Sequence, residues 1–136
     1  MSKTFYLAGK VQGNDALDKT KNFSTELESR GHTNICRWWE MKGVTKPYLD
    51  NLDLNAPLAV EMLNAAFNAE VFILFAQDDI LGAAIEFGAG LASVEHVPDK
   101  RIYIVGSYAV RKSVFYTHPS AENVNSLQDI RTRDWY

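Results

Sequence analysis

Residues 71–76 read Val-Phe-Ile-Leu-Phe-Ala and contain no polar side chain. A run this short and this continuously apolar is typical of a strand that is covered on both faces, as in the centre of a parallel sheet. Two more apolar runs, at residues 4–8 and 101–105, are each followed by a glycine and are predicted as strands. We therefore expect the chain to fold around a buried sheet.

The rest of the chain alternates between further strand and helix patterns. We predict shorter strands at residues 34–39 and 114–116, and helices at residues 14–30, 57–68, 80–94 and 121–130. Gly31 is a helix stop signal, Pro57 suits a first helical turn, and residues 40–55 are predicted as a long loop. This alternation predicts an α/β fold. We expect a flavodoxin-like, doubly wound order with about five mostly parallel strands and helices on both faces.

The composition limits the classes of protein that the chain can represent. Its 136 residues are 46% hydrophobic, which suits a single domain over residues 1–136. The net charge of -3 argues against binding to a nucleic-acid polymer but leaves a nucleotide pocket open. The lone Cys36 excludes an intrachain disulfide and a multi-cysteine zinc site, so we expect no metal and no cofactor. No signal peptide or membrane span is evident, and a cytoplasmic location is expected.

Glu86 is the only ionisable residue between Ile80 and Ala92, a stretch predicted to be helical. A carboxylate in apolar surroundings is costly unless it is paired or protonated. Glu86 is therefore paired with a cation at an interface, protonated, or facing a cleft where it takes part in chemistry. Gly82 lies one turn earlier on the same helical face and is a candidate substrate-binding residue.

Further candidates follow the predicted strands. Asp78 and Asp79 come after the central strand, where they would cap the next helix, bind sugar hydroxyls or supply an acid. The turn at residues 9–13 follows the first strand, and its Gly9 and Lys10 are candidates for binding substrate. That turn lacks the spacing of a dinucleotide or Walker motif, so ordinary turn chemistry also explains it.

Two aromatic residues complete the set of candidates. Tyr6, in the first strand, is a candidate catalytic residue with Glu86 and Asp79, although packing in the core is the simpler interpretation. Trp39 is a candidate for lining a base pocket, but alternation along a strand lets only one of Trp38 and Trp39 point to a given side.

Four segments, taken together, resemble the nucleoside 2-deoxyribosyltransferase family. Residues 5–9 resemble the family's first strand and glycine turn, and residues 69–74 resemble its central strand. Residues 82–88 resemble its glutamate motif, with glycines four residues before and two residues after Glu86. Residues 101–106 resemble the strand that follows. The resemblance covers most of the chain in order and spacing. It implies a flavodoxin-like fold and an enzyme that cleaves the N-glycosidic bond of nucleosides or nucleotides.

The resemblance also implies a mechanism. Glu86 would attack C1′ and form a covalent glycosyl-enzyme, which another base or water then resolves with retention of configuration. Ile80 stands where transferases of the family carry an aspartate, and Asp79 lies one residue earlier. Transferases of the family also carry an aspartate that contacts the sugar in the helix before the central strand, and Glu61 stands in that region as its candidate equivalent.

Alternative functions and an assembly are also expected. One alternative is a hydrolase of nucleoside 5′-monophosphates, another is a non-catalytic nucleotide-binding module, and a third is a structural domain with Glu86 in an interface ion pair. The apolar helix around Glu86 predicts at least a dimer. The family resemblance implies active sites shared between subunits, with residues 116–136 as the candidate donor segment.

Overall fold

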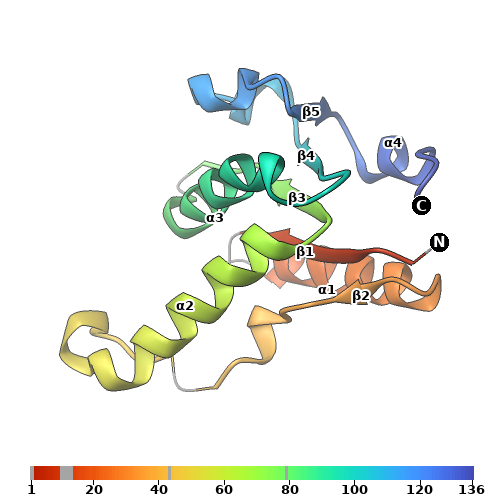
Figure 1. Ribbon diagram of the computed structural model, residues 1–136. Helices are drawn as coiled ribbons and strands as arrows, with labels where there is room; N and C mark the ends of the chain where they lie inside the picture. Colours follow the sequence, from red (N-terminus) through yellow and green to blue (C-terminus); the bar gives the residue numbers. More distant parts are fainter. Residues whose placement is uncertain (1, 10–13, 43, 79) are drawn as a thin grey trace.

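A computed structural model describes residues 2–9, 14–42, 44–78 and 80–136. Within these residues, five parallel strands form one sheet in the order β2-β1-β3-β4-β5 (Figure 1). The strands are β1 (Thr4–Ala8), β2 (Thr33–Asn34), β3 (Val71–Phe75), β4 (Arg101–Val105) and β5 (Ala121–Val124). The predicted α/β class, the flavodoxin-like order and the central place of residues 71–75 are confirmed.

Helices cover both faces of the sheet. The α-helices are α1 (Asn14–Ser29), α2 (Leu52–Asn68), α3 (Leu81–Ala92) and α4 (Leu127–Arg131). The short 3-10 helices are η1 (Trp38–Glu40), η2 (Tyr48–Asn51), η3 (Ser93–Glu95), η4 (Tyr108–Val110) and η5 (Val114–Thr117). The buried side chains of α2 and α3 share one core cluster, whereas those of α1 and α4 share the other. No helix of the described ranges is long and apolar enough to cross a membrane.

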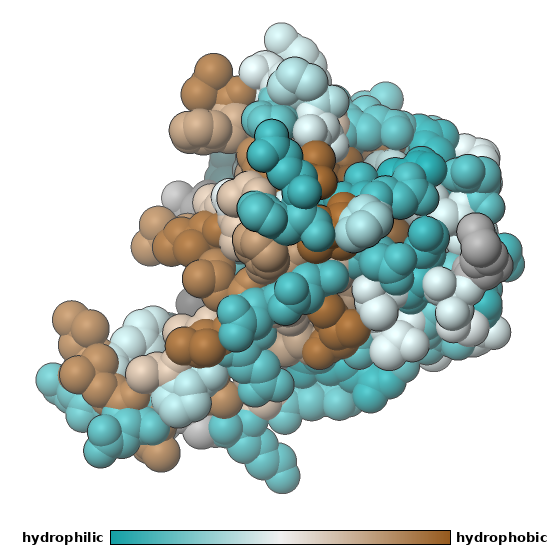
Figure 2. Space-filling view, in the orientation of Figure 1, coloured by the Kyte–Doolittle hydropathy of each residue, from teal (hydrophilic) through white to brown (hydrophobic). Residues whose placement is uncertain are grey.

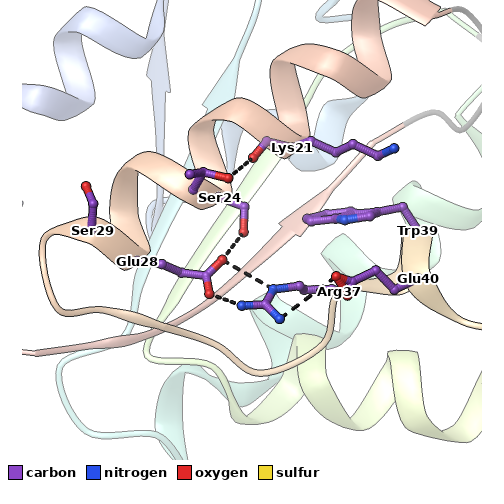
Figure 3. A pocket seen from close by; sticks show the side chains of 8 residues that line it. Lys21, Ser24, Glu28, Ser29, Arg37, Trp39 and Glu40 are labelled. Atoms are coloured by element: carbon purple, nitrogen blue, oxygen red, sulfur yellow. Dashed lines mark hydrogen bonds and ion pairs between the residues drawn. The ribbon is translucent and has the colours of Figure 1, made fainter.

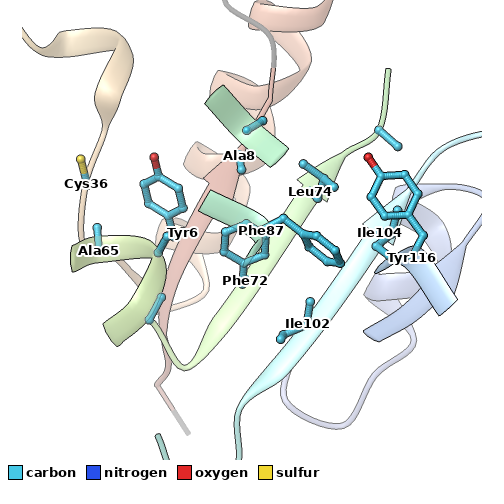
Figure 4. Close-up of a cluster of buried hydrophobic side chains, with 14 residues drawn as sticks. Tyr6, Ala8, Cys36, Ala65, Phe72, Leu74, Phe87, Ile102, Ile104 and Tyr116 are labelled. Atoms are coloured by element: carbon cyan, nitrogen blue, oxygen red, sulfur yellow. The ribbon is translucent and has the colours of Figure 1, made fainter. Parts of the chain in front are cut away.

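The alternation of side chains along the strands divides the core into these two clusters. Tyr6 and Phe72 point toward α2 and α3, where Figure 4 shows them with Phe87 of α3. Phe5 and Ile73 point toward α1 and α4. Because both faces are covered, both sets of alternating positions are buried, and the strands are continuously apolar.

The predicted strand at residues 34–39 is wrong beyond its first residue. The Asn34 side chain accepts a hydrogen bond from the Cys36 amide at 3.0 Å, which turns the backbone out of the sheet. Trp38 then enters the 3-10 helix η1, and its indole nitrogen donates to the Leu7 carbonyl at 2.6 Å. The apolar side chains of this segment are therefore carried by a turn and a 3-10 helix, and not by a strand.

The long loop predicted at residues 40–55 is partly helical. It contains η2, and α2 begins at Leu52, so Pro57 lies inside the helix and not in its first turn. At the other end of α2, the Lys100 ammonium donates to the carbonyls of Ala66 at 3.0 Å, Phe67 at 3.1 Å and Ala69 at 2.5 Å. This lysine satisfies carbonyls that have no partner within the helix.

The C-terminal elements also differ from the prediction. Residues 114–116 lie in the 3-10 helix η5, and the predicted helix at residues 121–130 divides into β5 and α4. Ser126 and Asp129 form a reciprocal capping box that starts α4 at Leu127. The Ser-x-x-Asp pattern is a helix-start signal, which explains why the helix cannot extend back into residues 121–124.

Candidate functional site

Glu86 and Tyr6 form the centre of the candidate site. Tyr6 is fully buried in β1, and its hydroxyl donates a hydrogen bond to Glu86 Oε2 from the second turn of α3. The Glu86 side chain is only partly exposed. No lysine or arginine within the described ranges forms an ion pair with it. Of the alternatives raised by the sequence, pairing with a cation is therefore not observed in the single chain.

The surroundings of this pair shift both acids toward their protonated forms. Burial raises the pKa of Glu86 from its ordinary 4.5 to about 7, and the hydrogen bond from Tyr6 opposes that rise. Burial, followed by the negative charge of Glu86, raises the pKa of Tyr6 far above its usual range. Tyr6 therefore remains a hydrogen-bond donor at all physiological pH values, while Glu86 changes charge near neutrality.

Cys36 lies beside this pair and was missed as a site residue. Figure 4 shows it next to Tyr6, at the end of the cluster that is lined by α2. Burial and then the charges of Glu61 and Glu86 raise the pKa of the Cys36 thiol to about 11. Cys36 is therefore an unreactive thiol, and the charge of Glu61, an exposed residue of α2, reaches Cys36. No pattern in the sequence pointed to Cys36, because the turn that begins at Asn34 determines where it lies.

A second feature lies at the carboxyl ends of β3 and β4. A cavity of about 640 Å³ is lined by Gln77, Asp78, Val110, Lys112, Ser113 and Tyr116. The Lys112 ammonium lies 3.1 Å from the Asp78 carboxylate. Asp78 therefore pairs with a cation, and the residue that precedes α3, Ile80, makes no side-chain cap. Neither Lys112 nor Tyr116 was predicted to line a site in its own chain, although their place after β4 fits the rule that ligands bind at this edge.

Trp39 lines a cavity that does not include Glu86. This cavity also has a volume of about 640 Å³, and its other lining residues come from α1 or adjoin Trp39 in the chain (Figure 3). Its ring meets that of Trp38 edge to face, with centroids 5.3 Å apart. In this cavity Arg37 is already paired with Glu28 by two hydrogen bonds. The predicted contribution of Trp39 to a base pocket therefore has no support from its position.

The remaining predicted residues divide into three cases. Lys10 and Asp79 lie outside the described residues. Gly9 follows the last residue of β1, and a Cβ added to it would be in ordinary contact with Phe75 at 3.5 Å. Gly82 is exposed on α3, and a Cβ built there would meet nothing within 4 Å. The structure thus brings Tyr6 and Glu86 together, whereas Trp39 lines a cavity that neither of them lines.

No family model matches the sequence, and no curated protein matches it either. In the described part of the chain, no group of three or more His, Cys, Asp or Glu residues is placed to hold a metal ion. The strand order shows the fold class, and the comparisons add no family to it.

Proposed function

We propose that the chain cleaves the N-glycosidic bond of deoxynucleosides and transfers the sugar to another base, as in the nucleoside 2-deoxyribosyltransferase family that its sequence resembles. The observation that carries this proposal is the contact between the Tyr6 hydroxyl and Glu86 Oε2. One carboxylate oxygen is held by a permanent donor, and no residue in the described ranges donates a hydrogen bond to the other oxygen, which would make the attack.

In the first step, Glu86 would attack C1′ while the bond from C1′ to the base nitrogen breaks. The base leaves with the bonding electrons and takes a proton from an acid, for which Asp79 is the candidate. A nitrogen of a second base then gives its proton back to that acid, attacks C1′ and releases the Glu86 carboxylate, so configuration is retained. Tyr6 would orient the carboxylate and stabilise its charge each time the carboxylate is released.

The ionisation of Glu86 fits this role. A nucleophile must be deprotonated, and a pKa of about 7 lets Glu86 exist in both forms at neutral pH. The cost of ionising it is relieved when it bonds covalently to the sugar, since the ester is neutral. A carboxylate with only a structural role would not need a pKa raised to about 7.

Hydrolysis of nucleoside 5′-monophosphates is a second candidate function. The supporting observation is Lys112 in the cavity beyond β3 and β4, because a phosphate could replace Asp78 as its partner. In this reaction water, and not a second base, resolves the intermediate. A third candidate is a nucleotide-binding module without turnover, favoured by the two departures from the family pattern, Ile80 and Glu61.

The decisive experiment is to incubate the purified chain with deoxynucleosides and a second free base, and to separate the products. Exchanged nucleoside supports the transferase. Base release without exchange, from monophosphates above all, supports the hydrolase. Tight nucleotide binding by calorimetry without turnover supports the binding module.

A matched pair of variants tests the role of Glu86. Glu86→Gln should lose activity, while Glu95→Gln, at an exposed glutamate of η3, should keep it. Mass spectrometry of the intact chain after mixing with a 2-fluoro-2-deoxynucleoside should show a sugar adduct on Glu86. Full activity of Glu86→Gln would remove the basis of the proposal.

A further inference from the structure

The cavity beyond β3 and β4 lies at the edge of the sheet where parallel α/β folds bind ligands. We call it the β4 cavity, and its lining residues are Gln77, Asp78, Val110, Lys112, Ser113 and Tyr116. Its volume of about 640 Å³ lies within the roughly 300–1,000 Å³ of small-molecule sites. Neither Glu86 nor Tyr6 lines it, so the contact between those two residues does not account for it.

Tyr116 brings a buried hydroxyl without a partner to this cavity. The residue is 7% exposed, and its ring meets that of Phe87 edge to face with centroids 5.4 Å apart (Figure 4). Its hydroxyl forms no hydrogen bond within the described ranges. Burial raises the pKa of Tyr116, so the hydroxyl keeps its proton at neutral pH. Such a group is destabilised unless something in the cavity hydrogen-bonds to it.

Two more lining side chains have unused hydrogen-bonding capacity. The Gln77 amide forms no hydrogen bond to any described residue. Ser113 Oγ accepts from the Phe115 amide at 3.2 Å, which leaves its own proton available for another acceptor. Hydroxyl and side-chain amide groups both donate and accept hydrogen bonds. A ligand of this cavity should therefore carry groups that do the same.

The charges of the lining residues cancel. The Lys112 ammonium lies 3.1 Å from the Asp78 carboxylate, and the two side chains are 71% and 64% exposed, so the ion pair lies at the rim. A phosphate or carboxylate would bind Lys112 only by displacing Asp78, whose charge would then repel it. An uncharged ligand leaves the ion pair intact and can hydrogen-bond to both of its members. The electrostatics of the cavity therefore favour an uncharged ligand.

The β4 cavity offers little apolar contact. Exposed apolar side chains gather on the side of the molecule that carries α3, where Leu81 is 82% and Ile85 is 60% exposed (Figure 2). In the cavity, Val110 is the only aliphatic lining residue, and the one aromatic ring, that of Tyr116, already packs on Phe87. Nucleobases are usually held by stacking on exposed aromatic faces. A sugar instead needs polar partners for its hydroxyls and a small apolar contact for its C–H groups, and both are present.

The wall that follows β4 is fixed before a ligand arrives. One guanidinium nitrogen of Arg111 donates to the carbonyls of Gly106 at 2.6 Å and Val124 at 2.7 Å, and to the Asn125 side chain at 3.1 Å. These bonds hold the segment next to Lys112 against the carboxyl ends of β4 and β5. A preformed wall lowers the entropy cost of binding.

We propose that the β4 cavity binds the ring of an uncharged sugar through the side chains of Gln77, Ser113 and Tyr116. The Asp78–Lys112 ion pair supplies an acceptor and a donor at the rim. Binding is non-covalent and needs no contribution from Glu86. The inference rests on the β4 cavity alone, so it stands whether or not the chain cleaves nucleosides.

The test follows the amide chemical shifts of the isotope-labelled full chain during titration with D-ribose and, separately, D-glucose. At least one sugar should cause saturable shifts at residues 76–78 and 110–116, with the millimolar dissociation constant expected of a ligand of about ten heavy atoms. Glu86→Gln should bind the sugar equally well, because Glu86 does not line the cavity.

A matched pair of tyrosine variants tests the contact itself. Tyr116→Phe keeps the ring on Phe87 and removes only the hydroxyl, so it should weaken sugar binding about 3- to 10-fold, the value of one hydrogen bond. Gln77→Leu should have a similar effect. Tyr108→Phe, at a tyrosine that is 89% exposed and does not line the cavity, should bind as the unsubstituted chain does. Circular dichroism checks that each variant is folded.

Four results would overturn the proposal. The first is the absence of saturable shifts with both sugars, and the second is a set of shifts centred on Glu86 that Glu86→Gln abolishes. The third is unchanged sugar affinity in folded Tyr116→Phe and Gln77→Leu. The fourth is a response of residues 76–78 and 110–116 to adenine or inorganic phosphate but to neither sugar, which would make the cavity a base or anion site.

Discussion

Replacing Glu86 with glutamine should remove a pH-dependent destabilisation of the folded chain. Glutamine has nearly the same shape, and its carbonyl can accept the hydrogen bond that Tyr6 now donates to the carboxylate. Unlike glutamate, it never ionises. The variant therefore imitates the protonated form of Glu86 at every pH.

The magnitude follows from the pKa of Glu86, which rises from about 4.5 in the unfolded chain to about 7 in the folded chain. Because the folded value is higher, the folded chain binds more protons between these two pH values, and its stability falls as pH rises. The stabilising effect of the proton is complete below about pH 4.5 and is lost as pH rises through about 7. At about 1.36 kcal/mol per pH unit, the loss is on the order of 3 kcal/mol.

The assay is urea denaturation of both proteins at pH 4.5, 6, 7 and 8, at one protein concentration, followed by circular dichroism. The difference in unfolding free energy should be smallest at the lowest pH and should grow to about 3 kcal/mol in favour of glutamine at pH 8. If the difference stays within about 0.5 kcal/mol across this range, burial does not raise the pKa of Glu86 in the folded chain.

Three other predictions concern single contacts. Tyr6→Phe should move the rising limb of the pH–activity profile to higher pH, because Glu86 loses the donor that stabilises its charge; an unchanged profile would argue against their coupling. Gly90→Ala should not bring the gain of about 1 kcal/mol that alanine normally gives a helix in thermal unfolding, since its Cβ would press on the Phe72 ring; a variant stabilised by that amount would contradict this packing. Lys100→Met should cost about 1–3 kcal/mol in urea unfolding by leaving carbonyls of α2 without a donor, and no loss would mean that water replaces it.

The fold could be predicted where burial on both faces of the sheet makes a strand continuously apolar. Residues 71–75 and 101–105 are apolar without interruption because helices cover both faces of the sheet, and both were correctly predicted as strands. The prediction failed where apolar residues serve another purpose. Val114 and Phe115 are 73% and 66% exposed in a 3-10 helix, so their apolar character does not indicate a strand.

The candidate site was only partly predictable for a similar reason. Glu86 stood out because it is the single charge in an apolar helix, and the contact with Tyr6 follows from the pairing of β1 beside β3. Cys36 could not be found, because its approach to this pair depends on the turn that Asn34 begins. Lys112 and Asp78 meet only through the loops after β3 and β4, whose path no local pattern determines.

The short outer strands of the sheet have a consequence for solubility. The segment Val71–Phe75 has the composition of an aggregation-prone peptide. It is kept from pairing with other chains because β1 and β4 already occupy both sides of its backbone. One outer strand, β2, has just two residues, and the other, β5, carries Glu122 in an ion pair with Arg133. Neither edge offers a long apolar strand on which another chain could add. Variants that release β2 or β5 should therefore aggregate before they lose the central strands.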